Sequence, residues 1–241
     1  MNQTGNKATE LLEALDSPDR PTIRAAVEAL IPLAADSSEL CETLEQLLHD
    51  EQRKNRWALA YILAHLAQPS SKTIETLLDG LDHREPDIRW AIGLLIVRLA
   101  RMENKIVQSL SELCATGSSA QKRMAVYCLR DLNLDDENSL QVFLELLHDP
   151  DPTVRVAAVI GLTKRTDLDT NGKQLLLRLY LDDPDFRVRN SAAITLSRLG
   201  SPSEEFLAAL REANECENAQ ARKAASSALA ILINKKVRSM R

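Results

Sequence analysis

One segment recurs seven times along the chain, and its regular spacing limits the folds that the sequence can adopt. The copies read "IRAAVEAL", "RWALAYIL", "RWAIGLLI", "KRMAVYCL", "VRVAAVIGL", "VRNSAAITL" and "ARKAASSAL". They close on the apolar residues Leu30, Leu63, Ile96, Leu129, Leu162, Leu196 and Leu229. Successive closing residues are 33 residues apart, with a single interval of 34. A fixed period of this length is typical of stacked structural units.

Within each copy the apolar residues form two blocks at helical spacing, separated by a polar turn such as "DSPDRPT" or "HDPDPT". Proline has no amide hydrogen to donate inside a helix, and aspartate favours a helix N-terminus, so these turns end one helix and begin the next. Only the fourth turn ("ATGSSAQ") and the seventh ("ECENAQ") lack proline. Each copy is therefore predicted to be a helix, a turn and a helix. One such pair cannot bury its apolar face alone, so the pairs are expected to stack into a solenoid.

The pattern D-P-x-V-R-x-A-A-x-x-x-L, seen here in "DPTVRVAAVIGL", resembles the short HEAT-like repeats first associated with phycobilisome lyases. The resemblance implies an all-α fold, an α-solenoid (superhelix) of seven HEAT-like repeats over about residues 5–236. It also implies one repeat domain over residues 1–241, with a short basic tail at 235–241, and a concave surface lined by the second helix of each repeat. The patterns of ankyrin and tetratricopeptide repeats are absent.

The repeat is interrupted once, between the fifth and sixth copies. Leucine normally stands three residues after the closing residue, but in the fifth copy this position is Arg165. The one extra residue of the longer interval also falls in this region, within "RTDLDTNGK" at residues 165–173. We predict that this segment bends the solenoid.

Composition favours a soluble helical protein, because 44% of the residues are hydrophobic while only 3% are aromatic. No apolar run approaches the roughly 20 residues that span a bilayer, and the first residues do not resemble a signal peptide, so we expect a cytoplasmic protein without a membrane contact. The four cysteines show no metal-site spacing and are expected to be reduced. The net charge of −5 disfavours nucleic acid as a partner.

No motif for catalysis, metal binding or cofactor binding is recognisable. The four histidines lie in different repeats, and there is no nucleophile elbow, Walker loop or Rossmann glycine pattern. The hydroxylases that share this repeat carry paired His-Glu dipeptides as iron ligands, and this chain contains no His-Glu. We therefore predict a binding protein rather than an enzyme, with no catalytic, metal or cofactor residues.

A cation recurs seven residues before the closing residue in six copies, at Arg56, Arg89, Lys122, Arg155, Arg189 and Arg222. Such a ladder resembles an anion site. Acidic residues recur in the turns just before it, however, and the planar guanidinium suits repeated pairing with carboxylates. We predict that this ladder is structural.

The remaining candidates lie on the second helices. At 100° per residue, one stripe faces away from the predicted core, and it holds both tryptophans and two of the three tyrosines. The candidate partner-binding residues on this stripe are Trp57, Tyr61, Trp90, Leu94, Arg101, Arg123, Tyr127 and Arg130. Exposed aromatic residues beside arginines are typical of binding hot spots. The alternative is that each tryptophan packs on the second helix of the adjacent repeat.

These observations predict a protein-interaction module (an adaptor, a chaperone-like factor or an immunity-type inhibitor) that binds a protein or peptide on its concave face. Because families with this repeat have diverse functions, two alternatives remain. One is a bilin lyase or other tetrapyrrole-handling factor, with Trp57, Tyr61 and Trp90 around the ring system and Arg123 or Arg130 on its propionates. The other is a nucleic-acid-binding protein similar to the all-helical DNA glycosylases.

Overall fold

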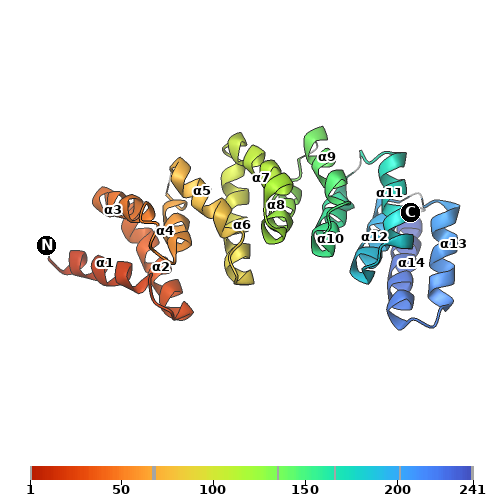
Figure 1. Ribbon diagram of the computed structural model, residues 1–241, viewed down its shortest axis with the longest axis horizontal. Helices are drawn as coiled ribbons and strands as arrows, with labels where there is room; N and C mark the ends of the chain where they lie inside the picture. Colours follow the sequence, from red (N-terminus) through yellow and green to blue (C-terminus); the bar gives the residue numbers. More distant parts are fainter. Residues whose placement is uncertain (1, 67–68, 135, 166, 201, 240–241) are drawn as a thin grey trace. The chain divides into compact units, whose positions relative to one another are not determined.

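A computed structural model describes residues 2–66, 69–134, 136–165, 167–200 and 202–239. These residues form fourteen α-helices, one short 3₁₀ helix and no strand (Figure 1). The predicted all-α fold is therefore confirmed. None of these helices is long and apolar enough to cross a lipid bilayer.

The helices form seven consecutive pairs, which match the seven predicted repeats. The first helices of the pairs are α1 (Asn2–Ala14), α3 (Ser38–Leu48), α5 (Ser71–Gly80), α7 (Asn104–Thr116), α9 (Glu137–Leu146), α11 (Thr170–Asp182) and α13 (Glu204–Glu215). The second helices are α2 (Arg20–Ala35), α4 (Arg56–Leu63), α6 (Pro86–Ala100), α8 (Ser119–Leu132), α10 (Pro152–Gly161), α12 (Phe186–Leu199) and α14 (Ala219–Ser239). The 3₁₀ helix η1 (Leu162–Lys164) follows α10.

The second helices pack on one another as well as on their own partners. Helix α10 contacts α8 and α12, helix α12 also contacts α14, and α2 contacts α4. Small residues such as Ala158 and Ala192, both fully buried, allow this close approach. By its contacts the chain divides into two compact units, Met1–Val107 and Gln108–Arg241, and all packing described below lies within one unit or the other.

Polar side chains cap the helices where the sequence predicts turns. Asp19, Asp151 and Asp185 each accept a hydrogen bond from a backbone amide in the first turn of a second helix. The two turns without proline use other caps. Ser118 forms a capping box with Gln121, and Asn218 Oδ1 accepts from the amides of the second and third residues after it. The predicted helix, turn and helix of each repeat is therefore confirmed.

The cations of the ladder bind mainly to the backbone of the preceding turn. Four of them share one geometry, in which the guanidinium donates to the carbonyls six and five residues earlier: Arg89, Arg155, Arg189 and Arg222. At Arg155 the two distances are 2.9 Å and 3.1 Å. These carbonyls follow the end of the first helix, where backbone acceptors lack helical partners. These four arginines therefore hold their turns closed.

Two cations of the ladder also connect successive repeats. The ammonium of Lys122 lies 2.8 Å from Asp149 in the next turn. Arg155 holds Asp183 through Nε and Nη2, at 2.8 and 2.9 Å. The predicted pairing with acidic side chains is thus confirmed at these two positions and wrong at the other four, because backbone carbonyls lie closer to those cations.

Arg165, at the interrupted position, is buried rather than displaced from the core. Its guanidinium donates to the carbonyls of Leu134 and Asp136, in the segment between α8 and α9, and pairs with Asp167. The hydrogen bonds from Arg165 hold the pKa of the Asp167 carboxyl below its usual value. A polar clamp therefore replaces the leucine contact of the other repeats.

We expect Arg155→Met to lower the free energy of unfolding by about 3–5 kcal/mol, because it leaves the Asp183 carboxylate buried without its cation. The two side chains are only 11% and 3% exposed. Arg187→Met is the matched control, since the side chain of Arg187 is 51% exposed in its pair with Asp185 and its loss should lower the stability far less. Urea titration followed by circular dichroism measures both, and equal losses would contradict the assigned role.

Candidate binding surface

Trp90 and Leu94 lie one turn apart on α6, and both are exposed. Their relative exposures are 44% and 65%, which are high for side chains of this size and polarity. Arg98 and Arg101 follow on the same helix and directly after it, and both are exposed. The helix thus presents two large apolar groups followed by two cations, as the sequence predicted.

Trp57 differs from Trp90, although both follow an arginine and precede an alanine. Trp57 is half-buried, and the edge of its ring packs against His83 with the ring centroids 5.8 Å apart. Helix α5 approaches Trp57 closely, because a Cβ atom added at Gly80 would lie 3.8 Å from the Cβ of Trp57. Its indole Nε1 is buried and has no hydrogen-bond partner among the described residues. The expectation that both tryptophans face away from the core is therefore wrong for Trp57, which packs against the third repeat.

His83, which packs against Trp57, takes part in further polar contacts. Burial lowers the pKa of His83, which favours its neutral form. The Nδ1 atom of His83 accepts a hydrogen bond from the amide of Glu85, and the Glu85 carboxylate pairs with Arg20 from the first repeat. Trp57 therefore lies beside a turn that is itself fixed to a distant part of the same unit.

The other candidate residues are partly buried. Tyr61 on α4 lies with its ring 4.8 Å from that of His65. In the second unit, Arg130 lies 5.2 Å above the ring of Tyr127 and pairs with Asp131, while Arg123 is half-buried near the start of α8. The structure thus distributes the predicted residues between both units, with the most exposed apolar groups on α6.

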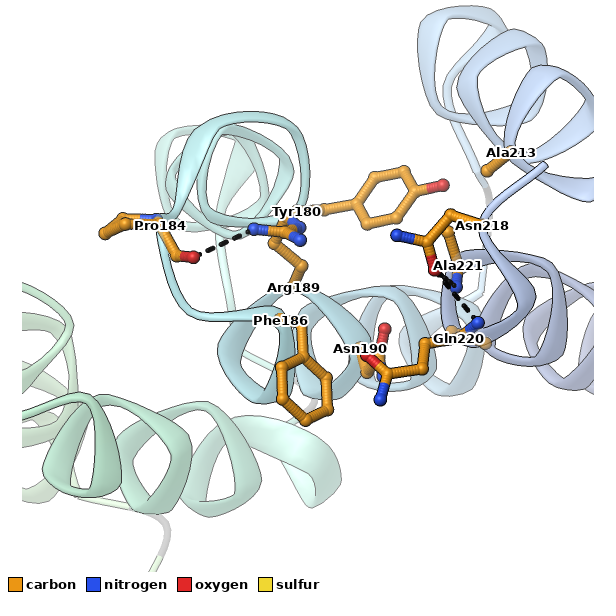
Figure 2. Close-up of a pocket in the computed structure, with 10 residues that line it drawn as sticks. Tyr180, Pro184, Phe186, Arg189, Asn190, Ala213, Asn218, Gln220 and Ala221 are labelled. Atoms are coloured by element: carbon orange, nitrogen blue, oxygen red, sulfur yellow. Dashed lines mark hydrogen bonds between the residues drawn. The ribbon is translucent and has the colours of Figure 1, made fainter. Parts of the chain in front are cut away.

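A pocket in the second unit was not predicted from the sequence. It has a volume of about 250 Å³ and lies near the N-terminal ends of α12 and α14. Figure 2 shows Phe186, Asn190 and Gln220 lying together, with Tyr180 and Asn218 nearby. Phe186 is 41% exposed, whereas the aligned positions of the other repeats hold no aromatic residue. This isolated aromatic is the sequence feature that could have indicated the pocket.

A second pocket in the same unit, of about 310 Å³, lies where α11, the end of α12 and the start of α13 meet. Leu177, Leu196 and Phe206 supply its apolar surface, while Lys173 and Glu205 bring opposite charges to it. These opposing charges give it no preference for either sign of ligand charge.

The structure gives little support for other chemistry. Among the described residues, no three His, Cys, Asp or Glu side chains come together in a way that could hold a metal ion. The guanidinium groups of the ladder are engaged with turn carbonyls rather than open to an anion. Burial raises the pKa of Cys114 and of Cys128 to about 12, so both remain thiols at neutral pH.

Comparison with known proteins relates the chain to one repeat type. The sequence model described as HEAT repeats matches residues 8–96, 74–163 and 140–230. A search of curated proteins finds no match. A solved mutant of Kap121p superposes with a TM-score of 0.65 and 13% identity, over 93% of this chain and 29% of that one. A structure of Kap95p with RanGDP gives 0.62 and 16%, over 94% and 34%. This chain spans about a third of either protein, and identities this low show the fold alone.

The two tryptophans should differ in fluorescence and in their effect on stability. In Trp90→Phe the remaining Trp57 should emit at shorter wavelength and resist acrylamide, whereas in Trp57→Phe the remaining Trp90 should emit at longer wavelength and be quenched. Trp57→Ala should cost about 1–3 kcal/mol, below the 3–5 of a fully buried tryptophan, and Trp90→Ala about 0.5 kcal/mol or less. Identical spectra and identical losses would show that the two environments are the same.

Proposed function

The chain belongs to the HEAT-repeat family, and from this premise we propose that the face of its second helices binds another protein or a peptide segment of one. In the first unit the site centres on Trp90 and Leu94, with Tyr61 and Arg101 around them. The protein acts as a binding module, in the manner of an adaptor, a chaperone-like factor or an inhibitor. In the second unit, Arg123, Tyr127 and Arg130 on the second helix α8 are separate candidates for contacts with a partner.

The observation that carries this proposal is the joint exposure of Trp90 and Leu94 on one helix face. Exposing two such side chains to water is unfavourable, and contiguous apolar groups on a surface mark interaction sites more often than isolated ones do. Tryptophan buries a large area on association and loses little rotamer freedom. Arginines at the edge supply directional hydrogen bonds, which is the composition found in binding hot spots.

The fold of the neighbours supports the same class of function. Kap95p, whose structure this fold resembles, binds RanGDP. The bilin hypothesis requires the rings of Trp57 and Trp90 to lie on either side of a tetrapyrrole. Trp57 packs against His83 instead, so its ring is not available for that contact. A protein partner needs only the exposed groups of α6.

We expect Trp90→Ala and Leu94→Ala each to weaken binding of the native partner by about 2 kcal/mol, or roughly 30-fold. The partner is first isolated with the wild-type protein from its native source, identified by mass spectrometry and prepared in pure form. Titration calorimetry then gives the dissociation constants of the variants.

Leu181→Ala is the matched control for this experiment, because Leu181 is also a large exposed side chain, at 42%, but lies on a first helix. It should leave the affinity within about twofold. Thermal melts confirm that all three variants are folded. Unchanged affinity in both α6 variants, or an equal loss in the control, would reject this site.

A further inference from the structure

The two sets of helices carry opposite charge. In sequence, the first helices hold fifteen acidic and six basic residues, whereas the second helices hold three acidic and seventeen basic residues. The three acidic exceptions are Glu28, Asp87 and Asp131. An ordinary solvated surface mixes charges of both signs. Here the acidic and the basic residues are segregated between the two sets of helices, although the net charge is only −5.

Many of the cations on the second helices are already engaged. The ladder cations bind turn carbonyls or the next turn's carboxylates, and Arg130 and Arg187 pair with acidic neighbours. Arg198 on α12 and Lys223 on α14 differ from these. Both are exposed, and neither has a carboxylate within ion-pair distance among the described residues. These two side chains are therefore available to an anionic partner.

Lys223 lies next to the pocket at Phe186. It follows Gln220, a lining residue, by three positions, so it stands one turn further along the same side of α14. Arg198 lies twelve residues after Phe186, about 18 Å along the axis of α12 at the helical rise per residue. Ile194, one turn before Arg198, is half-buried. An aromatic pocket, the half-buried Ile194 and two unpaired cations thus occur in the second unit.

The pocket is small for an independent ligand. Sites for small molecules usually measure about 300–1,000 Å³, and this one has about 250 Å³. It suits one apolar side chain of a longer chain. The side-chain amides of Asn190 and Gln220 have no hydrogen-bond partner among the described residues and match the donor and acceptor of a peptide group.

We propose that the second-helix surface binds an acidic protein segment, which inserts an apolar side chain beside Phe186 and places carboxylates on Lys223 and Arg198. This inference rests on the proposed function and adds the chemistry of the partner. Charge complementarity supports a peptide with a few carboxylates over nucleic acid. The segments outside the helices hold seventeen acidic and seven basic residues. This excess of acidic residues would repel a DNA duplex, which carries one negative charge per roughly 1.7 Å.

Selection from a random peptide library on the immobilised full chain tests the chemistry directly. We expect the enriched peptides to be acidic and to contain an aromatic or aliphatic residue. One enriched peptide, labelled with fluorescein, is then titrated by anisotropy at low and high salt, and its affinity should fall as salt rises. Enrichment of basic or neutral peptides, or no enrichment, overturns the proposal, and so does tighter binding of a labelled DNA duplex.

Charge reversal with a matched control locates the site. Arg198→Glu combined with Lys223→Glu should weaken the peptide at least tenfold, and Phe186→Ala should weaken it by a factor that changes little with salt. Arg178→Glu combined with Arg211→Glu makes the same change of charge at exposed cations on first helices of the same unit and should have less than a twofold effect. Equal losses in the two double variants would place the peptide elsewhere.

A second copy of the chain is the other candidate to occupy this surface, because its acidic first helices complement the basic second helices. Sedimentation of the wild type and of Arg198→Glu/Lys223→Glu distinguishes this case. A dimer that the double variant abolishes would overturn the proposal of a separate acidic partner. If the native partner depends on Trp90 and Leu94 while no acidic peptide binds, the charge inference fails and the proposed function stands.

Discussion

The repeats of the second unit depend on one another to bury their second helices. A single helix pair has too little apolar surface to fold alone, and burial is completed only when one second helix packs between two others. Helix α10, between α8 and α12, shows this arrangement, with Val154, Ala157 and Ala158 fully buried. On the remaining side of α10, Val156 and Ile160 are half-buried.

The same constraint determines how the polar groups are used. Close stacking brings the ends of the first helices near the starts of the second ones, and the turn carbonyls there lack helical partners. The arginine of the ladder satisfies two of them at a time, as at Arg222. Where the repeat pattern is broken, Arg165 performs a comparable task for the segment after α8. The main role of the repeated cations in this chain is thus to close turns. Only cations outside the ladder are available to bind a partner.

Local sequence alone does not decide which side chains a partner can reach. Trp57 and Trp90 have the same immediate neighbours and the same place on a second helix. Trp57 is half-buried because the ring of His83 packs against it and α5 approaches it closely at Gly80. Trp90 is left 44% exposed. Trp57 therefore packs on the adjacent repeat, against its first helix and turn rather than its second helix, while Trp90 remains a candidate contact.

The sequence by itself determined the repeat length, the seven helix pairs and the position of the turns, because these follow from periodicity and from the chemistry of proline and aspartate. It also identified Trp90 and Leu94. Tertiary structure alone decided that the ladder binds carbonyls, that Arg165 is buried and that a pocket forms at Phe186. The burial of Arg165 and the pocket at Phe186 depend on distances between residues far apart in the sequence, whereas the ladder geometry depends on how each turn folds. Helical periodicity specifies the direction of a side chain, but only packing specifies what that side chain meets.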